Sequence, residues 1–182
     1  MNRIKFFFKS KIYFDQYLFI SITLLSIMGL VFLYSASQEN LETTLKQSFF
    51  VVFGLVLMFI LSQLDPDFYK NHSSIFLLIA ILLIILTLFI GKEVNGAKRW
   101  LDLGLFTLQP SEVIKVALPV FLAAYLYDKS LPINLFHTFI SLILILFVVN
   151  LVRIQPDLGT SLVIFIAGIY ILFLAGLSWR FI

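Results

Sequence analysis

The sequence predicts an all-α protein, a polytopic integral membrane protein built from transmembrane helices. Of the 182 residues, 61% are hydrophobic and only 13% are charged, whereas a soluble domain carries about 25% charged residues. The mean hydropathy is +1.05. Apolar runs of near-spanning length recur along the whole chain, and such runs are typical of helices that cross a bilayer.

Six apolar runs account for most of the chain. Each is close to the about 17–25 residues that a tilted helix needs to cross the hydrocarbon layer. The runs lack the alternating pattern of barrel strands, and a helix satisfies its own backbone hydrogen bonds inside the bilayer. We therefore expect a single membrane bundle over residues 17–177, with spans at residues 17–34, 48–64, 73–90, 111–127, 135–152 and 158–177.

Basic residues predict the orientation of these spans. Segment 1–16 is rich in basic and aromatic side chains, and with this segment inside, the inner segments hold seven basic residues and the outer segments five. Cytoplasmic loops are enriched in Lys and Arg, so we predict a cytoplasmic N-terminus. A charged start followed by the first apolar run also resembles a cleavable signal peptide. The length of this run and the spans after it favour an uncleaved signal-anchor.

Several site types are excluded or disfavoured. The chain has no cysteine, which excludes disulfides, thiolate metal sites and cysteine nucleophiles. The net charge of +3 is modest and the basic residues are dispersed, so we do not expect nucleic-acid binding. Neither His72 nor His137 has a partner at metal-ligand spacing. We therefore predict no metal site and identify no cofactor.

The longest polar interruption is the loop at residues 91–110, which lies outside the membrane in this orientation. It contains Lys92, Lys98 and Arg99, three of the five outer basic residues. Cations gathered on the outer face run against the general trend and suit an anionic ligand or a lipid headgroup. Trp100 favours the membrane–water boundary, so we expect the loop to lie on the bilayer.

Polar side chains also gather where the fourth predicted helix begins. Pro110 suits the first helical position, and Glu112 follows in the first turn, where the helix dipole favours an anion. Lys115, three residues later, is within reach of Glu112 on the same face. Pro119 removes the hydrogen bond that the carbonyl of Lys115 would accept. Either the pair only neutralises itself at an interface, or it lines a polar cavity, because an unpaired charge in a span costs about 2.5–3.5 kcal/mol.

A second polar segment, residues 153–160, lies between the fifth and sixth predicted helices on the same predicted side. Asp157 after Pro156 makes a plausible N-cap for the sixth helix. Arg153 and Gln155 add more polarity than a cap requires. We therefore expect the two polar segments to converge at the outer ends of the fourth and sixth helices.

Both polar segments resemble signature segments of a known family. The motifs are G-A-K-R-W-L-D-L-G-x-F-x-x-Q-P-S-E-x-x-K at residues 96–115 and Q-P-D-L-G-T at residues 155–160. They are similar to those of the SEDS family (shape, elongation, division and sporulation proteins), and the similarity covers all six spans in order. The stretch L-A-G-L-S-W-R at residues 174–180 and the short basic N-terminus are more similar to members that act in elongation than in division.

The resemblance implies a peptidoglycan glycosyltransferase of the bacterial inner membrane. Such proteins polymerise lipid II, a lipid-linked pyrophosphate, during cell elongation and rod-shape maintenance, beside a class B penicillin-binding protein. Two alternatives stay open: a lipid II flippase, since intramembrane charges fit either activity, and a non-catalytic scaffold of the elongation complex. Carried over by motif, the residues that line or shape the substrate cavity are Arg99, Gln109, Ser111, Glu112, Lys115, Gln155 and Asp157.

SEDS proteins have ten spans, so the resemblance implies that this chain corresponds to the first six. The aspartate expected to act as general base then lies in an outer loop between the seventh and eighth spans, beyond Ile182. We assign no catalytic residue within this chain, and the resemblance leaves a divalent cation open. Residues 178–182 are expected to be a truncated cytoplasmic end, and this portion alone is expected to be inactive.

Overall fold

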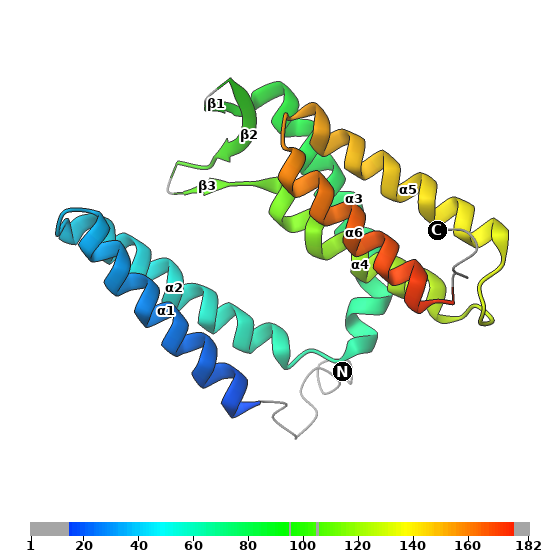
Figure 1. Ribbon diagram of the computed structural model, residues 1–182, viewed down its shortest axis with the longest axis horizontal. Coiled ribbons are helices and arrows are strands. Elements are labelled where there is room, and N and C mark those ends of the chain that lie inside the picture. The colour runs from blue at the N-terminus through cyan, green and yellow to red at the C-terminus, as the bar shows by residue number, and fades with distance from the viewer. Residues whose placement is uncertain (1–14, 95, 105, 177–182) are drawn as a thin grey trace, which may run out of the picture. The chain divides into compact units, whose positions relative to one another are not determined.

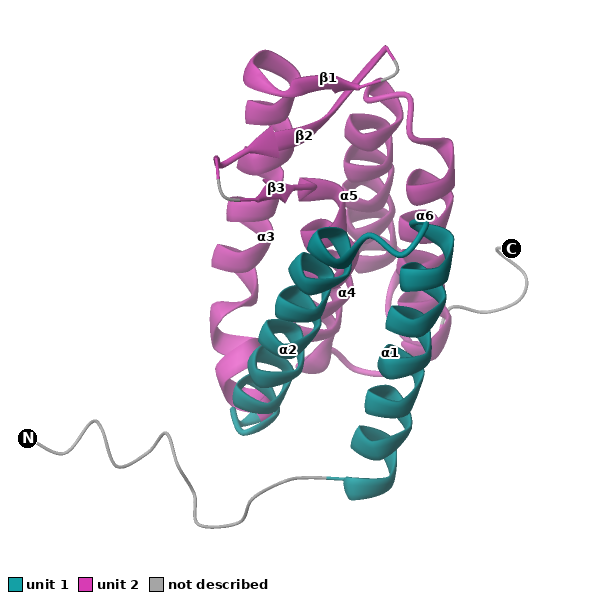
Figure 2. Ribbon diagram, turned by 90° about the vertical axis from the view of Figure 1, so that its left-hand side faces the viewer, with its two compact units in different colours: residues 1–65 teal, residues 66–182 magenta. Residues whose placement is uncertain are grey.

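The computed structural model describes residues 15–94, 96–104 and 106–176, in two compact units, residues 1–65 and 66–182 (Figures 1 and 2). The predicted helical class is confirmed. Among these residues, five helices are long and apolar enough to cross a membrane. In chain order the elements are α1 (Gln16–Ala36), α2 (Leu41–Ser62), α3 (Pro66–Ile90), β1 (Lys92–Val94), β2 (Ala97–Asp102), β3 (Thr107–Leu108), α4 (Pro110–Tyr127), α5 (Leu135–Ile154) and α6 (Leu158–Leu174).

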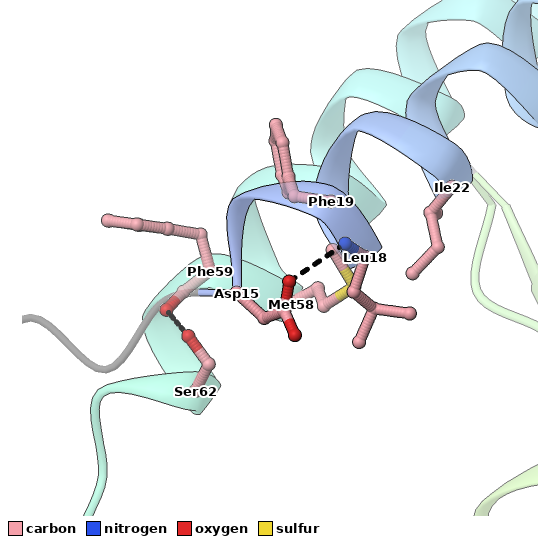
Figure 3. Close-up of a pocket in the computed structure, with 7 residues that line it drawn as sticks. All are labelled: Asp15, Leu18, Phe19, Ile22, Met58, Phe59 and Ser62. Atoms are coloured by element: carbon pink, nitrogen blue, oxygen red, sulfur yellow. Dashed lines mark hydrogen bonds between the residues drawn. The ribbon is translucent and has the colours of Figure 1, made fainter.

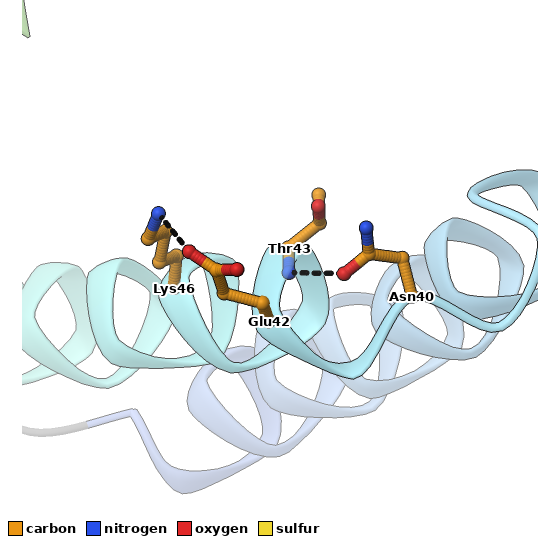
Figure 4. Close-up of polar contacts among 4 residues, drawn as sticks. All are labelled: Asn40, Glu42, Thr43 and Lys46. Atoms are coloured by element: carbon orange, nitrogen blue, oxygen red, sulfur yellow. Dashed lines mark hydrogen bonds and ion pairs between the residues drawn. The ribbon is translucent and has the colours of Figure 1, made fainter.

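Unit 1 is a helical hairpin in which local polar contacts fix both helix starts. Asp15 caps α1 by accepting hydrogen bonds from the backbone N–H groups of residues 17 and 18, each at 3.0 Å. Asn40 caps α2 by accepting one from Thr43 at 3.1 Å. In the next turn, Lys46 and Glu42 form an ion pair at 2.6 Å (Figure 4). Such caps satisfy backbone donors that have no partner inside the helix.

The remaining surface of the hairpin is apolar. No residue of α1 or α2 is buried within the structure, as suits helices that face lipid on much of their surface. Near the start of α1 and the end of α2, a cavity of about 110 Å³ lies between the two helices (Figure 3). Leu18, Ile22 and Met58 form part of its apolar lining, and Asp15 and Ser62 supply its polar groups.

Unit 2 is a bundle of α3, α4, α5 and α6 around one apolar core. All four helices contribute side chains with no more than 1% exposure, among them Ile84, Ile114, Leu118, Ile145, Val148, Ile164 and Leu172. The sheet of β1, β2 and β3 lies across one end of this bundle (Figure 2). We call this the sheet end of unit 2.

A glycine determines how closely α5 and α6 approach. A Cβ at Gly168 would lie 2.7 Å from Cγ1 of Ile145, closer than carbon atoms can pack. Small residues at helix–helix contacts permit such an approach in membranes. We expect Gly168→Val to destabilise the protein by about 1–3 kcal/mol through overpacking, measured as a lower thermal unfolding midpoint in detergent. Gly54→Val is the matched control, because no atom outside its own helix backbone and chain neighbours lies within 4 Å of that site. Equal midpoints for the two variants would contradict this account.

The sheet is the main feature that the sequence did not predict. Residues 91–110 were expected to form a loop, and they instead contain an antiparallel sheet in the order β1-β2-β3. Lys92 is paired with Trp100 in β1 and β2, and Leu101 with Leu108 in β2 and β3. Gly96 and Gly104, at φ values of 75° and 82°, lie in the connections, where a left-handed backbone favours glycine.

Helix boundaries differ from the predicted spans mainly at polar ends. α2 begins at Leu41 and α3 at Pro66, whereas the predicted runs began at residues 48 and 73. Hydropathy detects only the apolar part of a helix, and both helices begin with polar turns. Asn40 caps the polar first turn of α2. α6 ends at Leu174, and with 17 residues it lies at the lower limit of spanning length. The predicted end of this span at residue 177, and segments 1–14 and 178–182, lie outside the described residues.

Candidate functional site

The two polar segments that the sequence singled out meet at the sheet end of unit 2. The Arg99 side chain, from β2, donates from Nε to the carbonyl of Gln155 at 2.9 Å and from its guanidinium to the carbonyl of Pro156. Gln109, the residue before α4, donates from Nε2 to Oδ2 of Asp157 at 3.3 Å. The structure thus brings together four of the predicted site residues in two pairs, which are 56 and 48 positions apart in the chain.

Asp157 has two roles in this arrangement. Its Oδ1 accepts the backbone N–H of Thr160 at 3.1 Å, so it is the N-cap of α6, as predicted. Its Oδ2 accepts the hydrogen bond from Gln109. The carboxylate of Asp157 therefore caps the first turn of α6 and also holds Gln109, the residue before α4.

Gln155 is the most deeply buried of the predicted site residues with a long side chain, at 2% exposure. Its Nε2 donates to the carbonyl of Ile84 in α3 at 3.3 Å, whereas its Oε1 has no hydrogen-bond partner among the described residues. Ser111 is also buried, and its hydroxyl likewise has no such partner. Buried polar atoms without partners are rare in proteins. Packing alone therefore does not explain why positions 111 and 155 carry polar side chains.

Glu112 and Lys115 form the predicted ion pair, with Nζ and Oε1 2.7 Å apart. The side chains are 56% and 29% exposed, respectively. Pro119 lies inside α4, as expected, so the carbonyl of Lys115 lacks the usual i+4 donor. Within the described residues, no hydrogen bond or ion pair joins this pair to Asp157. A shared substrate cavity formed by this pair and Asp157 therefore stays a prediction.

Some charged side chains at the sheet end of unit 2 have an ion-pair partner, and others have none. Asp102 accepts the backbone N–H of Gly104 at 2.9 Å and lies 3.5 Å from Nζ of Lys92. The hydrogen bond from Gly104, together with the charge of Lys92, lowers the pKa of Asp102 below its usual value. Lys92 is thus partly neutralised. Among the described residues, Lys98 and Arg153 are exposed and have no carboxylate partner.

The list of candidate site residues omitted these two cations. Lys98 adjoins Arg99 in β2, and Arg153 is in the last turn of α5. Lys98 lies within the first family motif, but the resemblance implies a role in the cavity for neither residue. In the folded chain, Lys92 is paired with Asp102 and Arg99 is bound to two backbone carbonyls. These contacts leave Lys98 and Arg153 as the side chains available for an anion. No group of three or more potential metal-ligating side chains occurs in the described part of the chain.

The fold and the composition of its helices define a multi-pass α-helical membrane protein. The chain belongs to the FtsW/RodA/SpoVE family, described as cell cycle proteins, whose sequence model matches residues 15–182. It is 34% identical over 175 residues to the peptidoglycan glycosyltransferase MrdB of Escherichia coli (strain K12), covering 96% of this chain and 47% of that protein. It is also 37% identical to the probable peptidoglycan glycosyltransferase FtsW of Aliivibrio salmonicida, covering 94% of this chain and 46% of the relative.

Solved structures agree with this assignment. The crystal structure of the rod shape determining protein RodA of Thermus thermophilus matches with a TM-score of 0.85 at 30% identity, over 95% of this chain and 57% of that one. A chain from the structure described as "Structural coordination of polymerization and crosslinking by a peptidoglycan synthase complex" matches equally well, over 94% of this chain and 51% of that one. This chain therefore spans about half the length of the relatives that it matches.

Proposed function

We propose that this chain is the substrate-side part of a peptidoglycan glycosyltransferase that polymerises lipid II during cell elongation and rod-shape maintenance. Its relative in Escherichia coli is named a peptidoglycan glycosyltransferase, and its relative in Aliivibrio salmonicida a probable one. The observation that carries the proposal is the junction of the two family motifs through Arg99–Gln155 and Gln109–Asp157. This junction places the unpaired cations Lys98 and Arg153 on elements that meet at one site.

The chemistry expected at this site is the displacement of a pyrophosphate. A sugar hydroxyl of one lipid-linked molecule attacks the anomeric carbon of another, a glycosidic bond forms, and the bond to the pyrophosphate breaks. Lys98 and Arg153 would hold the anionic headgroup at the membrane boundary and offset the charge that develops on the leaving group. The general base that takes the hydroxyl proton is expected beyond Ile182, by the family resemblance.

Purified lipid II added to the reconstituted full-length protein tests this function. Glycan strands that lengthen with time would support the proposal. Translocation of lipid II across vesicles without polymerisation would favour the flippase, for which the charges of Glu112 and Lys115 within α4 are the relevant observation. If neither activity is detected and the protein still assembles with its partner, the scaffold is favoured.

We further propose a class B penicillin-binding protein as the partner, supported by the similarity to a chain of a peptidoglycan synthase complex. No cofactor is identifiable from the described residues, and a divalent cation would reach the site with the pyrophosphate. Three of the described carboxylates near the sheet end already have partners, Asp102 with Lys92, Glu112 with Lys115, and Asp157 with Gln109. Glu93 of β1 is exposed and forms no ion pair among the described residues. Omitting Mg²⁺ from the polymerisation assay tests the need for a cation.

The proposed location is the bacterial inner membrane, with the N-terminus in the cytoplasm. Because residues 1–182 contain no cysteine, a single introduced cysteine can report its own side of the membrane. We expect Glu93→Cys, in β1, to react with a membrane-impermeant maleimide added to the periplasmic side. Lys129→Cys, at the opposite end of α4, is expected to react only after the inner membrane is opened. The reverse pattern would contradict the orientation.

A further inference from the structure

We infer that Arg99 is a positioning residue that fastens β2 to the turn between α5 and α6, and that it leaves the anion of the substrate to Lys98 and Arg153. The family motif alone placed Arg99 among the residues that line or shape the substrate cavity. Its contacts in the folded chain assign it a different task. The kinetic part of this inference rests on the proposed function, and the structural part does not.

The hydrogen-bond donors of Arg99 are used by backbone carbonyls of the protein. Nε of Arg99 donates to the carbonyl of Gln155 at 2.9 Å, and its guanidinium also donates to the carbonyl of Pro156. The planar guanidinium presents its donors in a fixed fork, and here one fork holds two consecutive carbonyls. Two of the five guanidinium donors, along the edge that Nε shares with one terminal nitrogen, are thereby used by the protein itself.

The carbonyls that Arg99 binds lie at the end of a helix. Gln155 is the C-cap of α5, and the last carbonyls of a helix have no partner inside it. They also carry the negative end of the helix dipole, where a cation is stabilising. Arg99 therefore caps α5 from a strand that lies 56 residues earlier in the chain. Such a cap couples the sheet to the bundle.

Two side chains of the same turn are also bound to distant parts of unit 2. The side chain of Gln155 is bound to the carbonyl of Ile84 in α3, and Asp157 is bound to Gln109 before α4. The turn is thus held from α3, from β2 and from the start of α4. Loss of Arg99 removes the hydrogen bonds that tie β2 to this turn. Ala97 and Leu101 keep β2 buried against the bundle, so we expect a local shift of the strand and its Lys98 relative to the turn.

Lys98 supplies the contrast within the same strand. It precedes Arg99, and successive residues of a strand point to opposite faces. Lys98 is exposed and stands opposite Glu93 of β1 in the strand register. No ion pair joins the two residues, and none ties Lys98 to another described carboxylate. Two adjacent cations of one strand therefore have separate tasks: Arg99 fastens the strand, and Lys98 is available to an anion.

A distance measurement between the sheet and the bundle tests the structural part. In the full-length protein, with any native cysteine beyond Ile182 replaced by serine, spin labels are attached at Val94→Cys in β1 and Ile166→Cys in α6. Both positions are exposed. We expect a single narrow distance distribution for the parent and for Lys98→Gln. We expect a broadened or shifted distribution for Arg99→Gln and for Arg99→Lys, because an ammonium is a point charge without the two-donor fork.

Kinetics with lipid II test the division of tasks. Misplacement of a site by about 1 Å can lower a rate 100-fold, so Arg99→Lys is expected to lower kcat by about this factor with little change in KM. Lys98→Gln is expected to raise KM for lipid II instead. A parent-like distance distribution in Arg99→Lys, or a change confined to KM in that variant, would overturn the inference. If the parent shows no polymerisation, the proposed function fails, and the distance measurement still decides the role of Arg99.

Discussion

Glu112→Ala and Lys115→Ala, introduced separately into the full-length protein, are each expected to abolish glycan polymerisation. The two charges lie 2.7 Å apart near the start of α4. Removing one leaves the other unpaired in a helix of membrane-spanning length, where an isolated charge is costly. Loss of a preorganised polar group at a reacting centre lowers kcat by about 100- to 1,000-fold. The rate of glycan formation from purified lipid II is the measurement.

The chain contains a matched control for this experiment. Glu42 and Lys46 form a similar ion pair on α2, at 2.6 Å and with both side chains at least 70% exposed. Glu42→Ala and Lys46→Ala are expected to leave the polymerisation rate within about twofold of the parent, since exposed pairs contribute little. Parent-like rates in both α4 variants would rule out the cavity interpretation. Loss of lipid II translocation in vesicles, with polymerisation intact, would instead favour the flippase.

Gln155→Glu is expected to destabilise unit 2 by about 3–5 kcal/mol at neutral pH, the cost of an uncompensated buried charge. The side chain is 2% exposed, and its nitrogen donates to the carbonyl of Ile84, which a carboxylate would repel. Burial raises the pKa of such a carboxyl above its value in the unfolded chain. The penalty is therefore present above the folded pKa and is relieved as pH falls, because the protonated group can donate to Ile84.

Thermal unfolding of the full-length protein in detergent, at neutral and at acidic pH, measures this effect. Asn134→Asp is the matched control at the other end of α5. It makes the same amide-to-carboxyl change at an exposed N-cap, where a carboxylate caps as well as an amide. Gln155→Met keeps the volume without the charge and is expected to cost only about 1 kcal/mol. Equal unfolding midpoints for Gln155→Glu and Gln155→Met at neutral pH would show that water reaches the side chain at position 155, and would contradict the prediction.

The features that the sequence predicted well depend on residues close together in the chain. Apolar runs identified the helices, because a helix in a bilayer must satisfy its own backbone. The ion pair of Glu112 with Lys115 and the cap by Asp157 follow from spacings of three residues. Pro110 at the start of α4 is similarly local. Polarity between the apolar runs identified the two polar segments, and the family motifs coincide with them, although their role in binding substrate stays a prediction.

Only the tertiary structure determined the contacts between residues that lie far apart in the chain. The sheet within residues 92–108 was missed because β1 and β3 have only three and two residues, too few for a periodic pattern. The sequence alone determined the membrane class, the helices and the local caps, since these depend on side-chain polarity and short spacings. Only the folded chain decided that Arg99 holds the end of α5 and that Lys98 stays unpaired. Those roles depend on pairings between residues that are many positions apart, which local propensity does not encode.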